Sequence, residues 1–150
     1  MSRRRRAREW VLRALYAAEV GAPEPEQLLE VLLTHDPPPE CDLEFARRLF
    51  LGALGDADRY DKEIAEQLEN WDLSRLALID LLILRLALVE MECFPDVPWK
   101  VTLNEMIELA KRYSDIRTGA FINGVLDGIL QRRARTAGMG PDPGPPDAPG

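Results

Sequence analysis

The stretch Leu-Ala-Leu-Ile-Asp-Leu-Leu-Ile-Leu-Arg-Leu-Ala-Leu-Val, residues 76–89, is the most hydrophobic part of the chain. Only Asp80 and Arg85 interrupt it, and it is too short to span a bilayer, which takes about 20 apolar residues. A helix that is apolar on nearly every side must be enclosed by other elements. We therefore predict a helix over about 73–91, N-capped by Asp72, at the centre of the fold.

The rest of the chain is also helical in pattern. Apolar residues recur at three- and four-residue steps, as on one face of a helix, and no convincing alternation typical of a strand is present. The pattern predicts helices at the N-terminus up to Gly21 and over about 24–33, 42–69, 100–113 and 118–133. Gly52 and Gly55 weaken the third of these, so we expect an interruption near Asp56. The sequence predicts an all-α fold.

The length of 150 residues fits one domain or two very small helical halves that share a core. The end of the chain is rich in proline and glycine and holds no core-forming residues, so we expect it to be disordered. Cys41 and Cys93 have no metal-ligand spacing and fit reduced structural thiols. The arginines near the start are not followed by the apolar run of a signal peptide. We expect a cytoplasmic protein with no membrane span.

Charge is segregated along the chain, although the net charge is −7. Residues 1–20 carry a net charge of +4 and residues 109–135 again +4, whereas residues 21–71 carry −9. If folding brings the two basic segments together, they form one positive face on an acidic body, as nucleic-acid-binding proteins often do. The alternative is that the first segment is only a solvated basic terminus.

No catalytic constellation is present in the sequence. His35, the one histidine, lies beside the break at residues 36–39 and fits a surface loop better than a catalytic base or metal ligand. The serines lack a nucleophile-elbow context, the glycines form no phosphate-binding loop, and Glu105 and Glu108 fit an ordinary exposed helix face. We predict a protein that is not an enzyme and that needs no cofactor or metal.

Three stretches together resemble the NusB family of transcription antitermination factors. The first is Arg3–Glu9 with Ala14-Leu15-Tyr16, and the second runs from Trp71 to Glu90. The third combines residues 97–111 with Phe-Ile-Asn-Gly-Val-Leu-Asp at 121–127, which is the most diagnostic motif. Their order and spacing match over about residues 3–130. One departure is Ala120, where family members often carry a basic residue.

The resemblance implies two small helical bundles packed together, at about 3–70 and 71–135 of a domain spanning 1–135, with a disordered tail at 136–150. It also implies binding to the boxA RNA of ribosomal RNA leader transcripts together with NusE, a ribosomal protein, in the antitermination complex of RNA polymerase. Some family members form homodimers. The implied protein-partner residues are Tyr16 and Asp80, and the implied RNA-binding residues are Arg3, Arg4, Arg5, Arg6, Arg8, Lys111, Arg112, Tyr113, Arg117 and Phe121.

Other interpretations stay open at this point. Phe121 lies on the apolar stripe of its helix and could be a core residue, and Asp80 could pair with a nearby basic group. Asn123-Gly124 could serve close helix packing. The whole chain could be a NusB-like RNA-binding module of a ribosomal RNA methyltransferase, or a helical scaffold that binds only proteins through its acidic middle.

Overall fold

The computed structural model describes residues 2–21, 24, 27–30, 34, 40–68 and 72–137. Within them the chain is helical and contains no strand, which confirms the predicted all-α class. The helices are α1 (Arg3–Glu19), α3 (Leu43–Gly55), α4 (Ala57–Ala65), α5 (Leu78–Cys93), α6 (Trp99–Tyr113) and α7 (Thr118–Thr136), with a 3₁₀ turn at Leu73–Arg75. His35, Trp71 and residues 138–150, including most of the predicted tail, lie outside the described residues.

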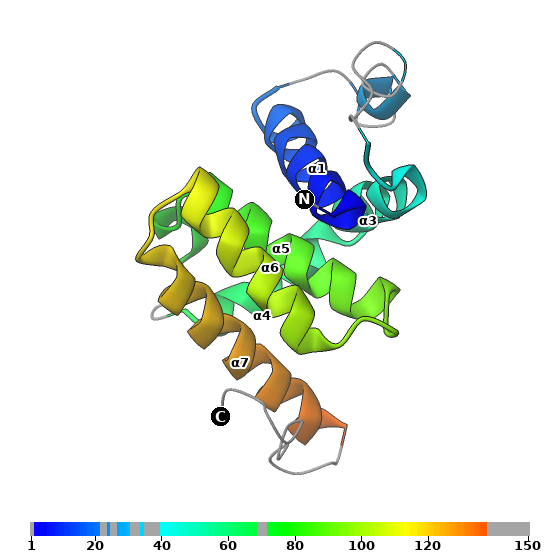
Figure 1. The fold of residues 1–150 in the computed structure, drawn as a ribbon. Coiled ribbons are helices and arrows are strands. Elements are labelled where there is room, and N and C mark those ends of the chain that lie inside the picture. Colours follow the sequence, from blue (N-terminus) through cyan, green and yellow to red (C-terminus); the bar gives the residue numbers. More distant parts are fainter. Residues whose placement is uncertain are drawn as a thin grey trace.

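Helix α5 is the centre of the molecule, as residues 76–89 predicted. It packs against α1, α3, α4, α6 and α7, and every residue from Leu82 to Glu90 is buried. In Figure 1, α1 and α3 lie together at one end, while α6 and α7 lie side by side toward the other. One continuous hydrophobic core links both groups. The division into two bundles at about residue 70 stays a prediction.

The start of the central helix differs from the prediction. Asp72 is an N-cap, but its carboxylate accepts a hydrogen bond from the Ser74 N–H at 3.0 Å and so caps the short 3₁₀ turn. Leu76 and Ala77 are then extended, with ψ of 141° at both, and α5 begins only at Leu78. The capping residue therefore starts one short turn instead of opening the long helix.

The interruption expected near Asp56 is present, because α3 ends at Gly55 and α4 begins at Ala57. Gly52 has a different reason to be glycine. A Cβ atom at this position would lie 2.8 Å from Cγ1 of Val89 on α5, which is closer than such atoms can approach. The missing side chain lets α3 lie against the buried centre of the fold.

Candidate nucleic-acid interface

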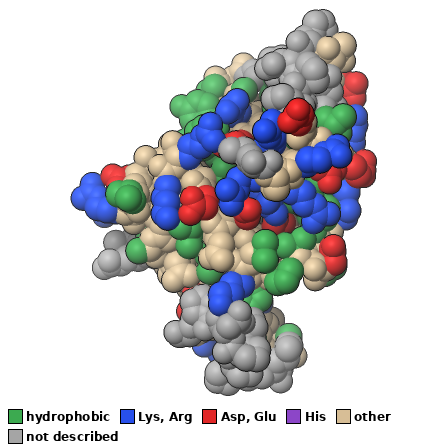
Figure 2. All heavy atoms as spheres, viewed as in Figure 1, with side chains coloured by type: hydrophobic (Ala, Val, Ile, Leu, Met, Phe, Trp, Pro, Cys, Tyr) green, Lys and Arg blue, Asp and Glu red, His purple; other side chains and the backbone are tan. Residues whose placement is uncertain are grey.

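Helices α1 and α6 meet along a row of polar contacts that join residues about 100 positions apart. Arg5 donates to the Glu105 carboxylate at 2.9 Å, Arg112 lies 2.6 Å from Glu9, and Arg13 donates to the Tyr113 hydroxyl at 2.8 Å. The start of the chain and the end of α6 therefore form one surface. Figure 2 shows a band of Lys and Arg side chains, with acidic ones among them, crossing this face of the molecule.

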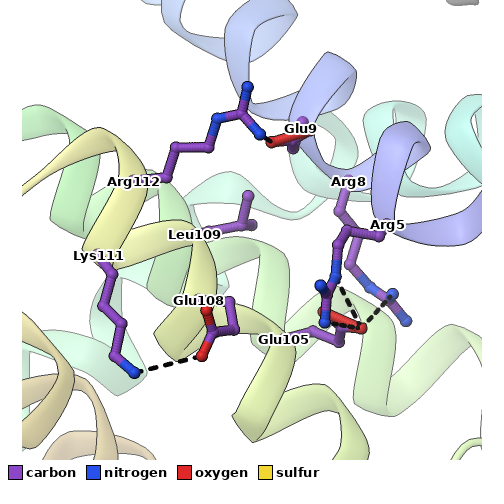
Figure 3. Close-up of a pocket in the computed structure, with 8 residues that line it drawn as sticks. All are labelled: Arg5, Arg8, Glu9, Glu105, Glu108, Leu109, Lys111 and Arg112. Atoms are coloured by element: carbon purple, nitrogen blue, oxygen red, sulfur yellow. Dashed lines mark hydrogen bonds and ion pairs between the residues drawn. The ribbon is translucent and has the colours of Figure 1, made fainter. Parts of the chain in front are cut away.

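A groove of about 230 Å³ lies between the two helices. Figure 3 shows Arg5 and Arg8 of α1 converging on Glu105, while Arg112 reaches back from α6 to Glu9. Lys111 lies 3.2 Å from Glu108 on the same helix. The cations are thus prearranged, and acidic partners hold each of these four side chains.

Arg8 is set apart by burial from the other arginines of this surface. Only 3% of its side chain is exposed, and it donates two hydrogen bonds to the fully buried Glu90, at 2.6 and 2.9 Å. The Thr102 hydroxyl donates a third bond to the same carboxylate. The predicted role of Arg8 in binding RNA is not supported by this placement, because the guanidinium already has its partners inside the protein.

The remaining arginines of the first turn face the segment that leads into α3. Arg3 donates to the backbone carbonyl of Cys41, Arg6 lies 3.3 Å from the Glu40 carboxylate, and Arg4 lies 3.8 Å from Asp42 with its guanidinium over the Phe45 ring. Arg4, Arg5 and Arg6 keep about a third or more of their side chains exposed. Exposed ion pairs are weak, so a phosphate can compete for these groups.

Two other predicted RNA-binding residues lie elsewhere, at the start of α7. Arg117 and Phe121 line a second hollow together with Asp80 of α5. Phe121 is 37% exposed, so it is not part of the hydrophobic core, although most of its surface is covered by the protein. Arg117 pairs with Asp115 at 3.1 Å, and this contact lowers the pKa of Asp115 and raises that of Arg117. Arg117 therefore stays cationic.

The two predicted protein-partner residues are both accessible, though to different degrees. Tyr16 is 42% exposed on α1, one turn beyond Arg13. Asp80 is half-buried and accepts a hydrogen bond from the Ser114 hydroxyl at 2.7 Å, so the end of α6 lies against it. This hydroxyl, not the basic group that the sequence suggested, is the partner that the structure gives for Asp80.

Some features of the surface were missed from the sequence. Glu105 and Glu108 were assigned to an ordinary exposed face, yet they hold Arg5 and Lys111. For Glu108 the signal was available, since this residue lies three positions before Lys111 on the same helix. The Arg5–Glu105 pair joins two helices and leaves no such local pattern. Conversely, Arg132 and Arg133 of the second basic segment do not join this face. Arg133 pairs with Glu63 of α4, and Arg132 pairs with Glu66 at the C-terminal end of that helix.

Among the residues that the structure describes there is neither a metal site nor a membrane-spanning helix. No group of His, Cys, Asp or Glu side chains there is arranged to hold a metal ion. None of the described helices is long and apolar enough to cross a membrane.

Comparison with known proteins decides the family. Residues 5–131 match the model of the NusB family. The chain belongs to the NusB family. It is 43% identical over 134 residues to a transcription antitermination protein NusB of Salinibacter ruber, covering 87% of this chain and 82% of that protein.

Solved structures agree with this membership. A T. maritima NusB structure is 38% identical, with a TM-score of 0.70, and covers 86% of this chain and 92% of its own. A chain in the crystal structure of a plectonemic RNA supercoil is 25% identical, with a TM-score of 0.77. The match covers 89% of this chain and 97% of that chain. As a NusB family member, this chain is a transcription antitermination factor, which is a regulatory protein and not an enzyme.

Proposed function

We propose that the chain binds the boxA RNA of ribosomal RNA leader transcripts together with the ribosomal protein NusE, and that this complex joins elongating RNA polymerase in the cytoplasm. The supporting observation is the row of contacts by which α6 places Lys111 and Arg112 in one groove with Arg5 of α1. The same row holds Tyr113 against Arg13. Arginine and lysine neutralise phosphates, and an aromatic ring can stack on an unpaired base. The similar chain from a structure of RNA supports the same role.

The RNA-contact set that we propose is smaller than the set implied by the resemblance to the NusB family. It leaves out the buried Arg8 and keeps the residues with exposed side-chain surface. Arg117 and Phe121 form a separate contact point at the start of α7. The proposed contacts are Arg3, Arg4, Arg5, Arg6, Lys111, Arg112, Tyr113, Arg117 and Phe121.

For the protein partner we propose a contact through Tyr16 and Asp80. An exposed tyrosine is a common anchor at interfaces, and a basic ribosomal protein is attracted to an acidic body. Tyr16 lies one turn beyond Arg13, whose partner Tyr113 precedes the Ser114 that binds Asp80. The two residues are therefore linked through the end of α6, beside the proposed RNA surface.

The direct test is a titration of labelled single-stranded leader RNA, with and without NusE. A variant with Lys111→Ala and Arg112→Ala should bind at least ~10-fold more weakly, and the slope of log affinity against log salt should flatten by ~0.7 for each phosphate that is no longer neutralised. Arg135→Ala, an exposed cation at the far end of α7, is the matched control. RNA binding that is absent or independent of salt would instead favour a scaffold that binds only proteins.

A further inference from the structure

A second groove, of about 420 Å³, lies between α6 and α7 beside the proposed RNA surface. Its volume is within the range of ~300–1,000 Å³ that is typical of small-ligand sites. It is lined by two lysines, two asparagines and two isoleucines, which are Lys100, Asn104, Ile107, Lys111, Ile116 and Asn123. Its two walls, helices α6 and α7, lie side by side in Figure 1.

The chemistry of this groove differs from that of the groove between α1 and α6. Three carboxylates, those of Glu9, Glu105 and Glu108, line the α1–α6 groove, whereas no acidic residue is among the described residues that line the second one. The second groove therefore favours an anion over a cation. Its asparagine amides carry both a donor and an acceptor, as the edge of a nucleobase does.

The apolar part of the groove also fits a base. Ile116 is 75% exposed, which is unusual for a large aliphatic side chain, and Ile107 is half-buried beside it. The wall on the α7 side is built of small residues, Gly119 and Ala120. A Cβ atom at Gly119 would lie 3.1 Å from Ile107, so α7 approaches α6 closely there and its short side chains leave the space above open.

Lys111 connects the two grooves, because its side chain lines both. The two grooves lie on either side of α6, so a single strand that crosses α6 at Lys111 can continue from one groove into the other. We propose that the α6–α7 groove is a subsite for an unpaired nucleotide of the same RNA strand, in which Asn104 and Asn123 bind the edge of the base and Lys100 and Lys111 bind the phosphates. This inference rests on the proposed RNA-binding function and adds to it a site that selects sequence.

We expect the second groove to distinguish RNA sequences, because the two grooves offer different chemical groups to the RNA. Contacts to phosphate give affinity and carry no sequence information, whereas hydrogen bonds to base edges do. The α1–α6 groove is rich in charge and offers no amide, while the α6–α7 groove offers two. Sequence preference should therefore depend on the second groove, and salt dependence mainly on the first.

The test compares the full chain with the double variant Asn104→Ala, Asn123→Ala in titrations of single-stranded RNA of about 6 and about 12 nucleotides. We expect the variant to bind the long RNA ~5-fold or more weakly, as when hydrogen bonds to one base are removed, with an unchanged salt slope. It should also lose the preference of the unmodified protein at one or two positions of the long RNA. Gln131→Ala, an exposed amide on α7 outside the groove, is the matched control.

A second variant guards against a change in folding. Ala120→Leu places a larger side chain at an exposed position of the groove wall and should weaken binding of the long RNA in the same way, with circular dichroism unchanged. Unmodified protein that binds neither RNA overturns the proposed function itself. Binding that depends on Arg112 but is unaffected by both groove variants overturns only the subsite. If the groove variants lose binding to the ribosomal protein while their RNA binding is unaltered, the subsite is also overturned, and the groove is instead a binding site for the protein partner.

Discussion

The guanidinium of Arg8 and the carboxylate of Glu90 form a two-bond ion pair in the interior, with donor–acceptor distances of 2.6 and 2.9 Å. The pair joins α1 to α5, and the Thr102 hydroxyl adds α6 to the same carboxylate. Burying two charges is costly, but removing Glu90 is worse, because the charge of Arg8 then stays in the core with only the more distant Glu105 carboxylate, at 3.7 Å, as an acidic partner.

We therefore expect Glu90→Gln to destabilise the protein by about 3–5 kcal/mol. Replacing both partners by apolar residues, Arg8→Met with Glu90→Leu, should cost less than the single change, because no charge remains buried. Urea unfolding of the three proteins measures both effects. A single variant within about 1 kcal/mol of the unmodified protein would show that the pair contributes little to stability.

The acidic residues of the α1–α6 groove should oppose RNA binding. Glu108 holds Lys111 at 3.2 Å on an exposed helix face, and a phosphate must displace it. We expect Glu108→Gln to raise RNA affinity by up to about fivefold, since an exposed ion pair is worth about 0.2–1 kcal/mol. Asp58→Asn, which removes an equal charge from α4, should change the affinity less. An equal gain in RNA affinity for the two variants would indicate an effect of net charge alone.

The central helix should be the most stable part of the fold. Leu82 is fully buried on α5, so Leu82→Ala should cost about 2–5 kcal/mol. Leu51→Ala, at a position 41% exposed on α3, should cost below about 1 kcal/mol. Hydrogen exchange should be slowest for the amides of α5. Fast exchange along residues 82–90 would contradict this assignment of the core.

Acid should weaken the junction of α4, α5 and α7. Burial by itself raises the pKa of Glu92, but Arg59 at 2.7 Å and Arg133 at 2.6 Å lower it overall below its ordinary value of 4.5. A carboxyl group whose pKa is lowered on folding stabilises the protein above its unfolded pKa, and this contribution is lost as the pH falls. The stability difference between the unmodified protein and Glu92→Gln should therefore shrink below about pH 4.5. Denaturant unfolding at about pH 7 and about pH 3.5 tests this, and a constant difference would contradict it.

The partner contact can be separated from a purely structural role. Tyr16→Asp or Asp80→Lys should weaken NusE binding by ~2 kcal/mol or more, the threshold of an interface hot spot, and neither change should much reduce RNA binding by the isolated protein. Ser114→Ala removes the hydroxyl that binds Asp80 and is the control. If calorimetry gives the same loss for Ser114→Ala, Asp80 acts by holding the end of α6 and not by contacting the partner.

The sequence predicted the architecture well because periodicity reports which residues are buried. Residues 76–89 are apolar all round and can only be central, and the two glycines near Asp56 marked the break between α3 and α4. The true start of α5 was not predictable in this way, since Asp72 caps a short 3₁₀ turn as well as it caps an α-helix.

The site was predicted only in outline. Charge segregation predicted one positive face if folding brings the two basic segments together, but it could not show whether they meet or which arginines pair with acids. Arg8 has the same composition signal as Arg5, and only the packing of α5 against α1 reveals that Arg8 is buried against Glu90. Arg132 and Arg133 count equally in the charge map, yet they bind α4. Tertiary partners far apart in sequence leave no local pattern.

The close approach of Gly52 to Val89 has a consequence at a distance. Helix α1 packs against both α3 and α5, and α3 packs against α5. The position of each of these three helices therefore depends on the other two. A methyl group at Gly52 would collide with Val89 at 2.8 Å and push α3 and α5 apart. Because α1 packs on both helices, we expect such a displacement to shift α1 relative to α6 and to disturb the contact between Arg5 and Glu105. The relative position of the charged residues on α1 and α6 therefore depends on the absence of a side chain at Gly52.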